Sequence, residues 1–331
     1  MGSSRTVLKP QAAKPDKSEE QSVRPGRLNE YIGQASAKEA ITVVLESAKA
    51  RQEAADHIIL YGPPGLGKTT LAQIVSHELD VPFKGTSGPA LERTGDLVSL
   101  LSALTPQTVL FIDEIHRLRR PLEEILYPAM EDRRVDVMMG KGPGARAISL
   151  NLPPFTLIGA TTRLGSLSNP LRDRFGTILH LDFYSEAELA VILQQAARKL
   201  NLEVDEDAVQ LIASRSRRTP RLALRLLRRS RDWALARENQ QRVHSSAVTA
   251  TLNLLGIDSR GLDELDRRYI QTLTDSGHPV GVSTLAATLH EDRETIEGVI
   301  EPYLLREGLI QRTPQGRCLT TKGNQPLKLL E

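Results

Sequence analysis

The feature that most constrains the fold is the segment of residues 62–69, Gly-Pro-Pro-Gly-Leu-Gly-Lys-Thr, which fits the P-loop pattern at every defined position. A short apolar segment, residues 57–61, precedes it, and the amphipathic stretch Lys68–Leu79 follows. In such a strand–loop–helix setting the glycines let backbone N–H groups converge on phosphate oxygens at a helix N-terminus. The sequence therefore predicts a nucleotide-binding domain. The alternative, a glycine-rich turn that binds nothing, is disfavoured by the complete match in this setting.

Short apolar segments alternate with longer amphipathic ones over residues 24–184. Residues 108–112, 155–159 and 177–183 are predicted to be buried strands like residues 57–61, and residues 37–51 to form a helix like 68–79. This alternation is typical of an α/β domain, with a parallel sheet covered by helices on both faces.

Only helical periodicity is visible over residues 185–255, which predicts a small α-helical domain. Ser185 followed by Glu188 fits a capping box, and Pro220 is well placed to open a further helix. The spacing of this helix predicts that the following side chains face the core: Leu222, Leu226, Leu227 and Trp233.

The last block reads as a winged helix, with three helices followed by a β-hairpin. The helices are expected at residues 262–275, 282–289 and 293–307, and the strands at 309–312 and 318–321. The expected organisation is a disordered tail (1–22), a large ATPase domain (23–184), a helical lid (185–255) and a winged-helix DNA-binding domain (256–331).

Composition excludes several classes of protein. The single cysteine, Cys318, rules out an intrachain disulfide and a multi-cysteine zinc site. No apolar stretch approaches the roughly 20 residues that span a bilayer, and the N-terminus lacks a secretory h-region. We therefore expect a cytoplasmic protein with no membrane partner. The net charge of +2 does not by itself indicate a nucleic-acid-binding protein, so the distribution of the basic residues along the chain is the better guide to such binding.

Two carboxylates end the second apolar segment, in the sequence Leu-Phe-Ile-Asp-Glu at residues 110–114. Downstream of a P-loop this is the expected Walker B element. Lys68 would then reach the β- and γ-phosphates of ATP, and Thr69 and Asp113 would hold Mg²⁺. Glu114 would orient and polarise the attacking water.

A hydroxyl after the next apolar segment is a candidate sensor of the γ-phosphate. We favour Thr162 over Thr161, and the alternative is a threonine pair that only caps the next turn. In the following Leu-Arg-Asp-Arg-Phe-Gly segment, Arg174 is the first candidate for an arginine finger and Arg172 the second. An ordinary ion pair with Asp173 is the alternative for this segment.

These motifs, in this order, resemble the AAA+ ATPases, and among them most closely the RuvB family, the motors of Holliday junction branch migration. Arg-Pro at residues 24–25 and Leu-Asn-Glu-Tyr-Ile-Gly-Gln at 28–34 are similar to the family's N-terminal signature. Further similar segments are Leu-Tyr-Pro-Ala-Met-Glu-Asp (126–132), Leu-Pro-Pro-Phe-Thr (152–156) and Glu-Pro-Tyr-Leu-Leu (301–305). The resemblance runs from about Val23 to the C-terminus.

Site residues follow from this resemblance, each at a matching position. Arg221 matches the second sensor arginine, which reports the nucleotide state from the lid. In place of the family's usual glycine just before Thr-Pro-Arg, this chain has Arg218, which would be strained if that position needs positive φ. The resemblance places the following residues at or close to the bound ATP or ADP: Val23, Arg24, Gly65, Lys68, Thr69, Thr70, Glu131, Asp132, Arg133, Arg174, Tyr184 and Arg221.

Residues 133–139 and 146–152 alternate around a glycine-rich turn at 140–144, which predicts a protruding hairpin. The resemblance implies that this hairpin docks the partner RuvA, with Ile148 and Leu150 on the docking face. The alternative is that both side chains pack on the parent domain.

The winged helix is the predicted DNA-contacting domain, because Arg293, Arg312 and Arg317 match the family's DNA-contacting positions. With 4% aromatic residues the chain is too poor in rings for a base-stacking platform, so backbone tracking of a duplex is favoured. Eight arginines between residues 215 and 231 also suggest phosphate contact, although a solvated or intersubunit face is the more common role of such a run.

The resemblance implies an ATP-driven translocase on double-stranded DNA at four-way junctions, active in recombination, DNA repair and the SOS response. It would work as a homo-oligomeric ring, expected to be hexameric, with RuvA, with RuvC resolvase as a further partner, and with its arginine finger supplied in trans. An AAA+ DNA-binding switch, such as a replication initiator, is the alternative. A protein unfoldase is disfavoured, because the chain lacks an aromatic-hydrophobic-glycine pore loop.

Overall fold

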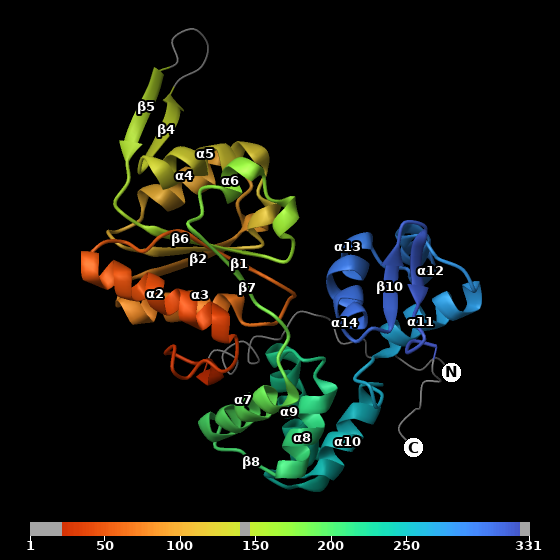
Figure 1. Ribbon diagram of the computed structural model, residues 1–331. Helices are drawn as coiled ribbons and strands as arrows, with labels where there is room; N and C mark the ends of the chain where they lie inside the picture. Colours follow the sequence, from red (N-terminus) through yellow and green to blue (C-terminus); the bar gives the residue numbers. More distant parts are fainter. Residues whose placement is uncertain (1–21, 140–145, 325–331) are drawn as a thin grey trace.

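The computed structural model describes residues 22–139 and 146–324, in an α/β core, a helical lid and a winged helix (Figure 1). Residues 1–21 of the expected tail (1–22) and the expected hairpin turn lie outside the described residues. No helix in the described part of the chain is long and apolar enough to cross a membrane.

The core is built on a five-stranded sheet in which all pairings are parallel, in the order β2-β3-β6-β1-β7. Four of the strands confirm the predicted apolar segments: β1 (Ile58–Tyr61), β3 (Val109–Asp113), β6 (Thr156–Thr161) and β7 (Thr177–His180). Sequence analysis missed β2 (Phe83–Ser87). This strand lies at an edge and is only half-buried, so Phe-Lys-Gly-Thr-Ser needs no apolar run.

Helices cover both faces of the sheet, as predicted. The helices α2 (Ala35–Arg51) and α3 (Lys68–Leu79) lie on one face, and α4 (Thr94–Ser102) and α5 (Arg120–Glu131) lie on the other (Figure 1). Alternate side chains of β1 serve the two faces, since Ile58 and Leu60 belong to one hydrophobic cluster and Ile59 to the other.

The lid contains four helices: α7 (Glu186–Lys199), α8 (Glu206–Arg215), α9 (Pro220–Trp233) and α10 (Ser245–Leu254). The predicted capping box at Ser185 and Glu188 is present at the start of α7. In α9, Leu226 and Leu227 are buried as expected, but the prediction for Leu222 and Trp233 was wrong, since both are only half-buried. Ala223 and Ser230 take the buried positions instead, because with Leu226 and Leu227 they complete the i, i+3, i+4, i+7 stripe.

The winged helix contains α11 (Glu264–Ser276), α12 (Val282–Leu289) and a hairpin of β10 (Ile310–Thr313) with β11 (Gly316–Leu319). The expected single helix over 293–307 is instead three pieces: α13 (Arg293–Thr295), a π-helical turn (Ile296–Ile300) and α14 (Glu301–Arg306). Pro302 accounts for the irregularity, because a proline inside a regular helix lacks a donor and clashes with the carbonyl four residues earlier.

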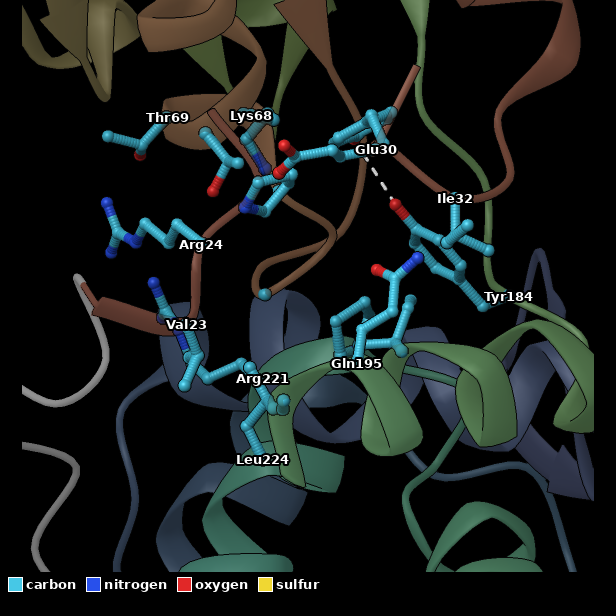
Figure 2. Close-up of a pocket in the computed structure, with 18 of the residues that line it drawn as sticks. Val23, Arg24, Glu30, Ile32, Lys68, Thr69, Tyr184, Gln195, Arg221 and Leu224 are labelled. Carbon is cyan, nitrogen blue, oxygen red and sulfur yellow. Dashed lines mark hydrogen bonds between the residues drawn. The ribbon is translucent and has the colours of Figure 1, made fainter. Parts of the chain in front are cut away.

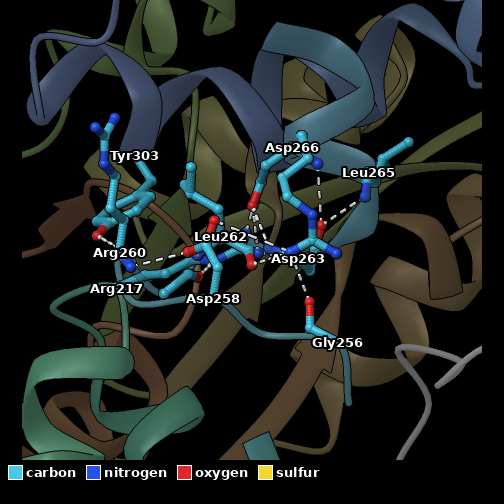
Figure 3. Close-up of polar contacts among 11 residues, drawn as sticks. Arg217, Gly256, Asp258, Arg260, Leu262, Asp263, Leu265, Asp266 and Tyr303 are labelled. Carbon is cyan, nitrogen blue, oxygen red and sulfur yellow. Dashed lines mark hydrogen bonds and ion pairs between the residues drawn. The ribbon is translucent and has the colours of Figure 1, made fainter. Parts of the chain in front are cut away.

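A network of polar groups around the buried Asp266 joins the lid to the winged helix (Figure 3). The guanidinium of Arg217 lies 2.6 Å from Asp263 and 2.5 Å from Asp266, and its Nε donates to the Gly261 carbonyl at 2.9 Å. The guanidinium of its neighbour Arg218 lies 3.0 Å from Glu307, which directly follows α14. These contacts fix the position of the winged helix against the lid.

The backbone at this junction adopts an unusual conformation. Arg217 has a φ of 47° and Arg218 a φ of 55°, so the position where the family usually has glycine does need positive φ here. A left-handed residue other than glycine costs roughly 1–2 kcal/mol. The ion pairs of both side chains with the winged helix offset that cost.

Candidate functional site

A cleft of about 1040 Å³, measured out to its open mouth, lies between the core and the lid. The core contributes Lys68 and Thr69 from one side, and the lid contributes Gln195, Arg221 and Leu224 from the other (Figure 2). A cleft between two domains is a usual place for a small-molecule ligand. The expected residues that line the cleft are Val23, Arg24, Gly65, Lys68, Thr69, Thr70, Asp113, Glu114, Tyr184 and Arg221.

The P-loop crosses from β1 to α3, and its glycines are required by close contacts. Gly62 has a φ of 146°, and a Cβ atom there would lie 2.2 Å from the Leu181 carbonyl oxygen. Gly67 has a φ of 94°, and a Cβ atom there would lie 3.0 Å from the Tyr31 hydroxyl. The loop can therefore approach both β7 and the N-terminal segment only because these residues lack side chains.

Lys68 is buried at the start of α3, and its ammonium donates to the carbonyls of Gly62 at 2.8 Å and Pro63 at 2.9 Å. Burial lowers the pKa of Lys68 to about 8, and the nearby Glu114 and Asp113 oppose that shift. The ammonium is therefore held at the loop in a low-dielectric setting, where attraction to phosphate oxygens is strong.

The two carboxylates lie at the carboxyl end of β3. Asp113 ends the strand, and Glu114 has a left-handed backbone (φ 48°), with its amide donating to Asp113 at 3.1 Å. Burial, with a contribution from Asp113, raises the pKa of the Glu114 carboxyl. A raised carboxyl pKa at the floor of a cleft suits a group that takes a proton from water.

Oxygen donors at this end of the cleft fit Mg²⁺. Thr69 offers a hydroxyl and Asp113 a carboxylate, and Mg²⁺ bound with a nucleotide usually takes one or two protein ligands together with phosphates and waters. Among the described residues, no group of three or more His, Cys, Asp or Glu side chains could hold a metal by itself. The donor set is therefore of the kind that binds Mg²⁺ jointly with a nucleotide.

Tyr184 joins the cleft to the hinge between the core and the lid. Its hydroxyl lies 3.2 Å from the Tyr31 hydroxyl, and both hydroxyls donate to the Leu66 carbonyl of the P-loop, at 3.3 Å from Tyr184 and 3.4 Å from Tyr31. Arg221 approaches the same loop from the lid, with its backbone amide 3.4 Å from the Gly65 carbonyl. Lid and P-loop are thus in direct contact.

Sequence reasoning missed a further set of lining residues. Three of them lie in the segment 28–34 that resembles the family's N-terminal signature, which could have pointed to them, and the other three lie on lid helices without a motif. The missed residues include Glu30, Tyr31, Ile32, Ile192, Gln195 and Leu224.

Glu131, Asp132 and Arg133 were expected close to the bound nucleotide, but none of them lines the cleft of its own chain. The reason is topological. They lie where α5 ends and strand β4 (Arg134–Met139) begins, and the hairpin of β4 with β5 (Arg146–Asn151) extends away from the lid (Figure 1).

Arg174 also lies outside the cleft of its own chain. Its guanidinium lies 3.1 Å from Glu131, donates to the Pro170 carbonyl at 2.6 Å and stacks 4.6 Å above the ring of Tyr127. The side chain is 23% exposed, so part of it is accessible to another molecule. The ion-pair alternative is thus realised with Glu131 and not with Asp173.

The two candidate sensor threonines differ in their surroundings. The Thr161 side chain is fully buried, with its hydroxyl 2.9 Å from His116 Nδ1 and accepting from the Arg163 amide at 2.9 Å. Thr162 is half-buried and follows the end of β6. Neither residue lines the cleft.

The hairpin face predicted for a partner is exposed. Ile148 is 45% exposed and Leu150 is 38% exposed. Leu150 stays exposed even though Val135, its partner on the neighbouring strand, is buried. The alternative, that both side chains pack on the parent domain, is therefore wrong. Exposed apolar side chains on a two-stranded ribbon are typical of a docking surface.

The basic segment 215–231 is not one uniform solvated face. Arg217 and Arg218 bind the winged helix, Arg221 reaches the cleft, and Arg229 and Arg231 each lie 3.1 Å from Asp232. Its arginines thus serve several separate contacts within the chain.

The three arginines predicted to contact DNA differ in accessibility. Arg293 is 66% exposed beside Glu297, and Arg312 is 48% exposed with its guanidinium 2.5 Å from Glu301. Arg317 is only 13% exposed, with its guanidinium 2.8 Å from Glu301 and 3.0 Å from Glu297. Arg317 is therefore mainly a partner of the buried Glu301 and the half-buried Glu297.

Replacing Glu301 by alanine is expected to destabilise the winged helix by about 3–5 kcal/mol, because two arginines would lose a fully buried counter-charge. Urea unfolding followed by circular dichroism measures the change. Glu294→Ala removes an exposed carboxylate from the same domain and is the matched control. Equal unfolding midpoints for Glu301→Ala and wild type would contradict the assignment.

Three domain profiles of one family match the chain. They are the Holliday junction DNA helicase RuvB P-loop domain at residues 23–181, the RuvB AAA lid domain at 184–258 and the RuvB C-terminal winged helix domain at 259–328. Together they leave out only the N-terminal segment, a short linker and the last residues.

Solved structures agree. The Holliday junction branch migration motor RuvB of Thermotoga maritima is 46% identical, with a TM-score of 0.83, over 92% of this chain and 97% of that one. An alanine-to-serine variant of the same protein has a TM-score of 0.84 and 46% identity, over 91% of this chain and 96% of its own.

Proposed function

The chain belongs to the RuvB family of ATP-dependent Holliday junction DNA helicases, and on that premise we propose that it couples ATP hydrolysis to translocation along double-stranded DNA. This activity would drive branch migration in recombination and in the repair of damaged DNA. One observation carries the proposal: the cleft joins the P-loop and two carboxylates of the core to Arg221 of the lid. Hydrolysis in such a cleft can move the lid relative to the core.

The proposed roles follow from the positions of the side chains. Lys68 would bind the β- and γ-phosphates of ATP. Thr69 and Asp113 would hold Mg²⁺, which would supply positive charge against the phosphates when bound. Glu114 orients and polarises the attacking water, and Arg221 reports the nucleotide state to the lid.

Thr162 is the better candidate for the γ-phosphate sensor, because the Thr161 hydroxyl is already engaged by His116 and by the Arg163 amide. The proposal would fail if Thr161→Val and not Thr162→Val uncoupled ATP binding from hydrolysis.

We propose that the active form is a ring, expected to be hexameric, in which Arg174 serves the nucleotide of the neighbouring subunit. The supporting observation is that Arg174, with Glu131, lies away from the cleft of its own chain, and that the Arg174 side chain is partly exposed. The same reasoning keeps Glu131, Asp132 and Arg133 as candidates for contact with a neighbour's nucleotide.

The winged helix is proposed to follow the phosphate backbone of the duplex. Arg293→Ala and Arg312→Ala should each weaken duplex binding roughly 3- to 10-fold, without sequence preference, and lower the salt slope by about 1. Fluorescence anisotropy at several salt concentrations measures both effects. Arg268→Ala, which removes an exposed arginine from α11, is the matched control, and an unchanged salt slope would exclude the two arginines from phosphate contact.

We further propose that RuvA docks on the exposed face of the β4–β5 hairpin through Ile148 and Leu150, and that RuvC resolvase acts on the same junctions. Apolar side chains this exposed are stabilised when a partner covers them.

The decisive experiment is ATP-dependent movement of a synthetic four-way DNA junction, with and without RuvA. Dissociation of the junction with ATP, and none with a non-hydrolysable analogue, is expected of a motor. ATP hydrolysis and RuvA binding without junction movement would instead favour an AAA+ switch that only holds DNA.

A further inference from the structure

We propose that His116 is a positioning residue for hydrolysis: its imidazole, held by Thr161, directs the Glu114 carboxylate and keeps it apart from Lys68. This inference rests on the proposed role of Glu114 in activating water. It adds a residue outside the P-loop, the Asp-Glu pair, the sensors and the finger.

The first support is the shape of the turn that follows β3. Glu114 adopts a left-handed backbone and precedes the 3-10 turn Ile115–Arg117. This turn brings the side chain of Glu114 close to that of His116. As a result, Glu114 Oε2 lies 3.2 Å from His116 Nδ1. In an extended continuation of β3 these two side chains would share a face but stand roughly 6–7 Å apart.

Neighbouring elements hold this turn closely on two sides. A Cβ atom on Gly88 would lie 2.5 Å from the Glu114 carbonyl oxygen, so the segment after β2 approaches the turn directly. A Cβ atom on Gly159 would lie 2.9 Å from Ile115 Cδ1, so β6 approaches from the other side. The left-handed residue is therefore fixed by its surroundings and does not depend on the nucleotide.

The imidazole itself is anchored from behind. The His116 side chain is 6% exposed, and its Nδ1 lies 2.9 Å from the hydroxyl of the buried Thr161. That hydroxyl also accepts from the Arg163 amide, which fixes it to the end of β6. Two elements of the sheet, β3 and β6, thus determine where the ring points.

The contact with Glu114 needs a proton on Nδ1. A protonated Nδ1 has one proton, which the Thr161 hydroxyl at 2.9 Å and the Glu114 carboxylate at 3.2 Å share, whereas a bare Nδ1 can only accept from Thr161 and leaves Glu114 without a donor. Burial, with Arg163 nearby, lowers the pKa of His116, which favours the neutral ring. A neutral ring with its proton on Nδ1 attracts the carboxylate through this shared proton while leaving the carboxylate free to accept a proton from water.

Without this donor, Lys68 is the competing partner. Lys68 and Glu114 line the same cleft, and their charges attract each other through a poorly solvated space. The Lys68 ammonium instead donates to the P-loop carbonyls, and within the described residues no ion pair joins it to Glu114. A Lys68–Glu114 ion pair would occupy both the ammonium that binds phosphate and the carboxylate that accepts a proton from water.

The test compares ATP turnover and nucleotide affinity in His116→Ala and His116→Asn. The amide of asparagine can place an N–H near the position of Nδ1, so it is the conservative replacement. We expect kcat to fall between about 10- and 100-fold in His116→Ala and to stay within about threefold of wild type in His116→Asn. The Kd for ADP, measured by calorimetry, should stay within about twofold in both.

Thr161→Val is a second, independent test, because it removes the hydroxyl that holds the His116 imidazole and leaves the volume of the side chain almost unchanged. It should lower kcat less than His116→Ala does, and the double variant should be no slower than His116→Ala alone. Two fully additive losses would mean that the two residues act separately, and that result would overturn the proposal.

Other outcomes are equally decisive. A kcat for His116→Ala within about twofold of wild type would overturn the proposal. Equal losses of kcat in His116→Ala and His116→Asn, accompanied by a lower melting temperature and weaker ADP binding, would overturn it too.

Glu114→Gln separates this inference from its premise. If Glu114→Gln keeps full turnover, the proposed role of Glu114 fails. If Glu114→Gln is inactive while His116→Ala is normal, only the role of His116 fails.

Discussion

Replacing Arg174 by alanine is expected to lower ATP turnover by about 10³-fold or more while leaving nucleotide binding to the isolated subunit unchanged. Loss of an arginine that stabilises the transferring phosphoryl group costs roughly 10³–10⁵ in rate. Binding should survive because Arg174 does not line the cleft of its own chain. Steady-state ATPase assays and ADP titration measure the two quantities.

A mixing experiment tests whether the arginine acts between subunits. Arg174→Ala subunits keep an intact P-loop, and Lys68→Ala subunits keep an intact Arg174. Mixed rings should therefore regain turnover at interfaces where an intact P-loop meets an intact arginine. Absence of any recovery, with mixing shown by crosslinking, would argue that Arg174 does not serve a neighbour.

Two further substitutions calibrate this result. Arg172→Ala removes the second candidate, whose guanidinium donates to Asn169, and should have a much smaller effect on turnover. Arg120→Ala removes an arginine that is 88% exposed on α5 and is the matched control. A larger loss in Arg172→Ala than in Arg174→Ala would reverse the assignment.

Lys68→Ala is expected to abolish junction movement and to reduce ATP turnover by at least about 10²–10³-fold. The ammonium is the one P-loop side chain that carries positive charge, and removing a preorganised donor to a developing charge has an effect of this size. Branch migration of a labelled four-way junction, resolved on native gels, is the measurement.

The control for Lys68→Ala is Lys49→Ala, which removes a half-exposed lysine of α2 that lies 4.0 Å from Glu78, outside the cleft. It should move junctions like wild type. Junction movement by Lys68→Ala at the wild-type rate would mean that the motor does not depend on this P-loop.

Much of the nucleotide cleft could be predicted because local sequence determines it. The P-loop has to follow a strand and open a helix, so Lys68 and Thr69 could be placed from their spacing alone. Asp113 could be placed at the same sheet edge, since the carboxyl ends of parallel strands meet there. Strand β2 escaped prediction because a half-buried edge strand carries neither an apolar run nor clean alternation.

Contacts between distant segments could not be predicted in the same way. Glu131 was expected near the nucleotide, but its ion-pair partner is Arg174. Only the packing of the end of α5 against the segment around residues 169–174 brings the two side chains together. Arg317 was expected to face DNA, yet Glu301 and Glu297 enclose it, because the wing folds back on α14. His116 carries no motif signal, since its meaning depends on a left-handed residue at Glu114.

The ion pairs of Arg217 and Arg218 have a mechanical consequence. Because they tie the winged helix to the lid four and three residues before Arg221, the two domains should behave as one stiff lever arm. Its fulcrum would then be the short segment between β7 and α7, where Gln34 exchanges hydrogen bonds with the backbone of Asp182. A small rotation of the lid at the nucleotide would then become a larger displacement of the winged helix. Loss of the Arg217 ion pairs would let the lid move without the winged helix, so ATP would be hydrolysed without movement of the DNA.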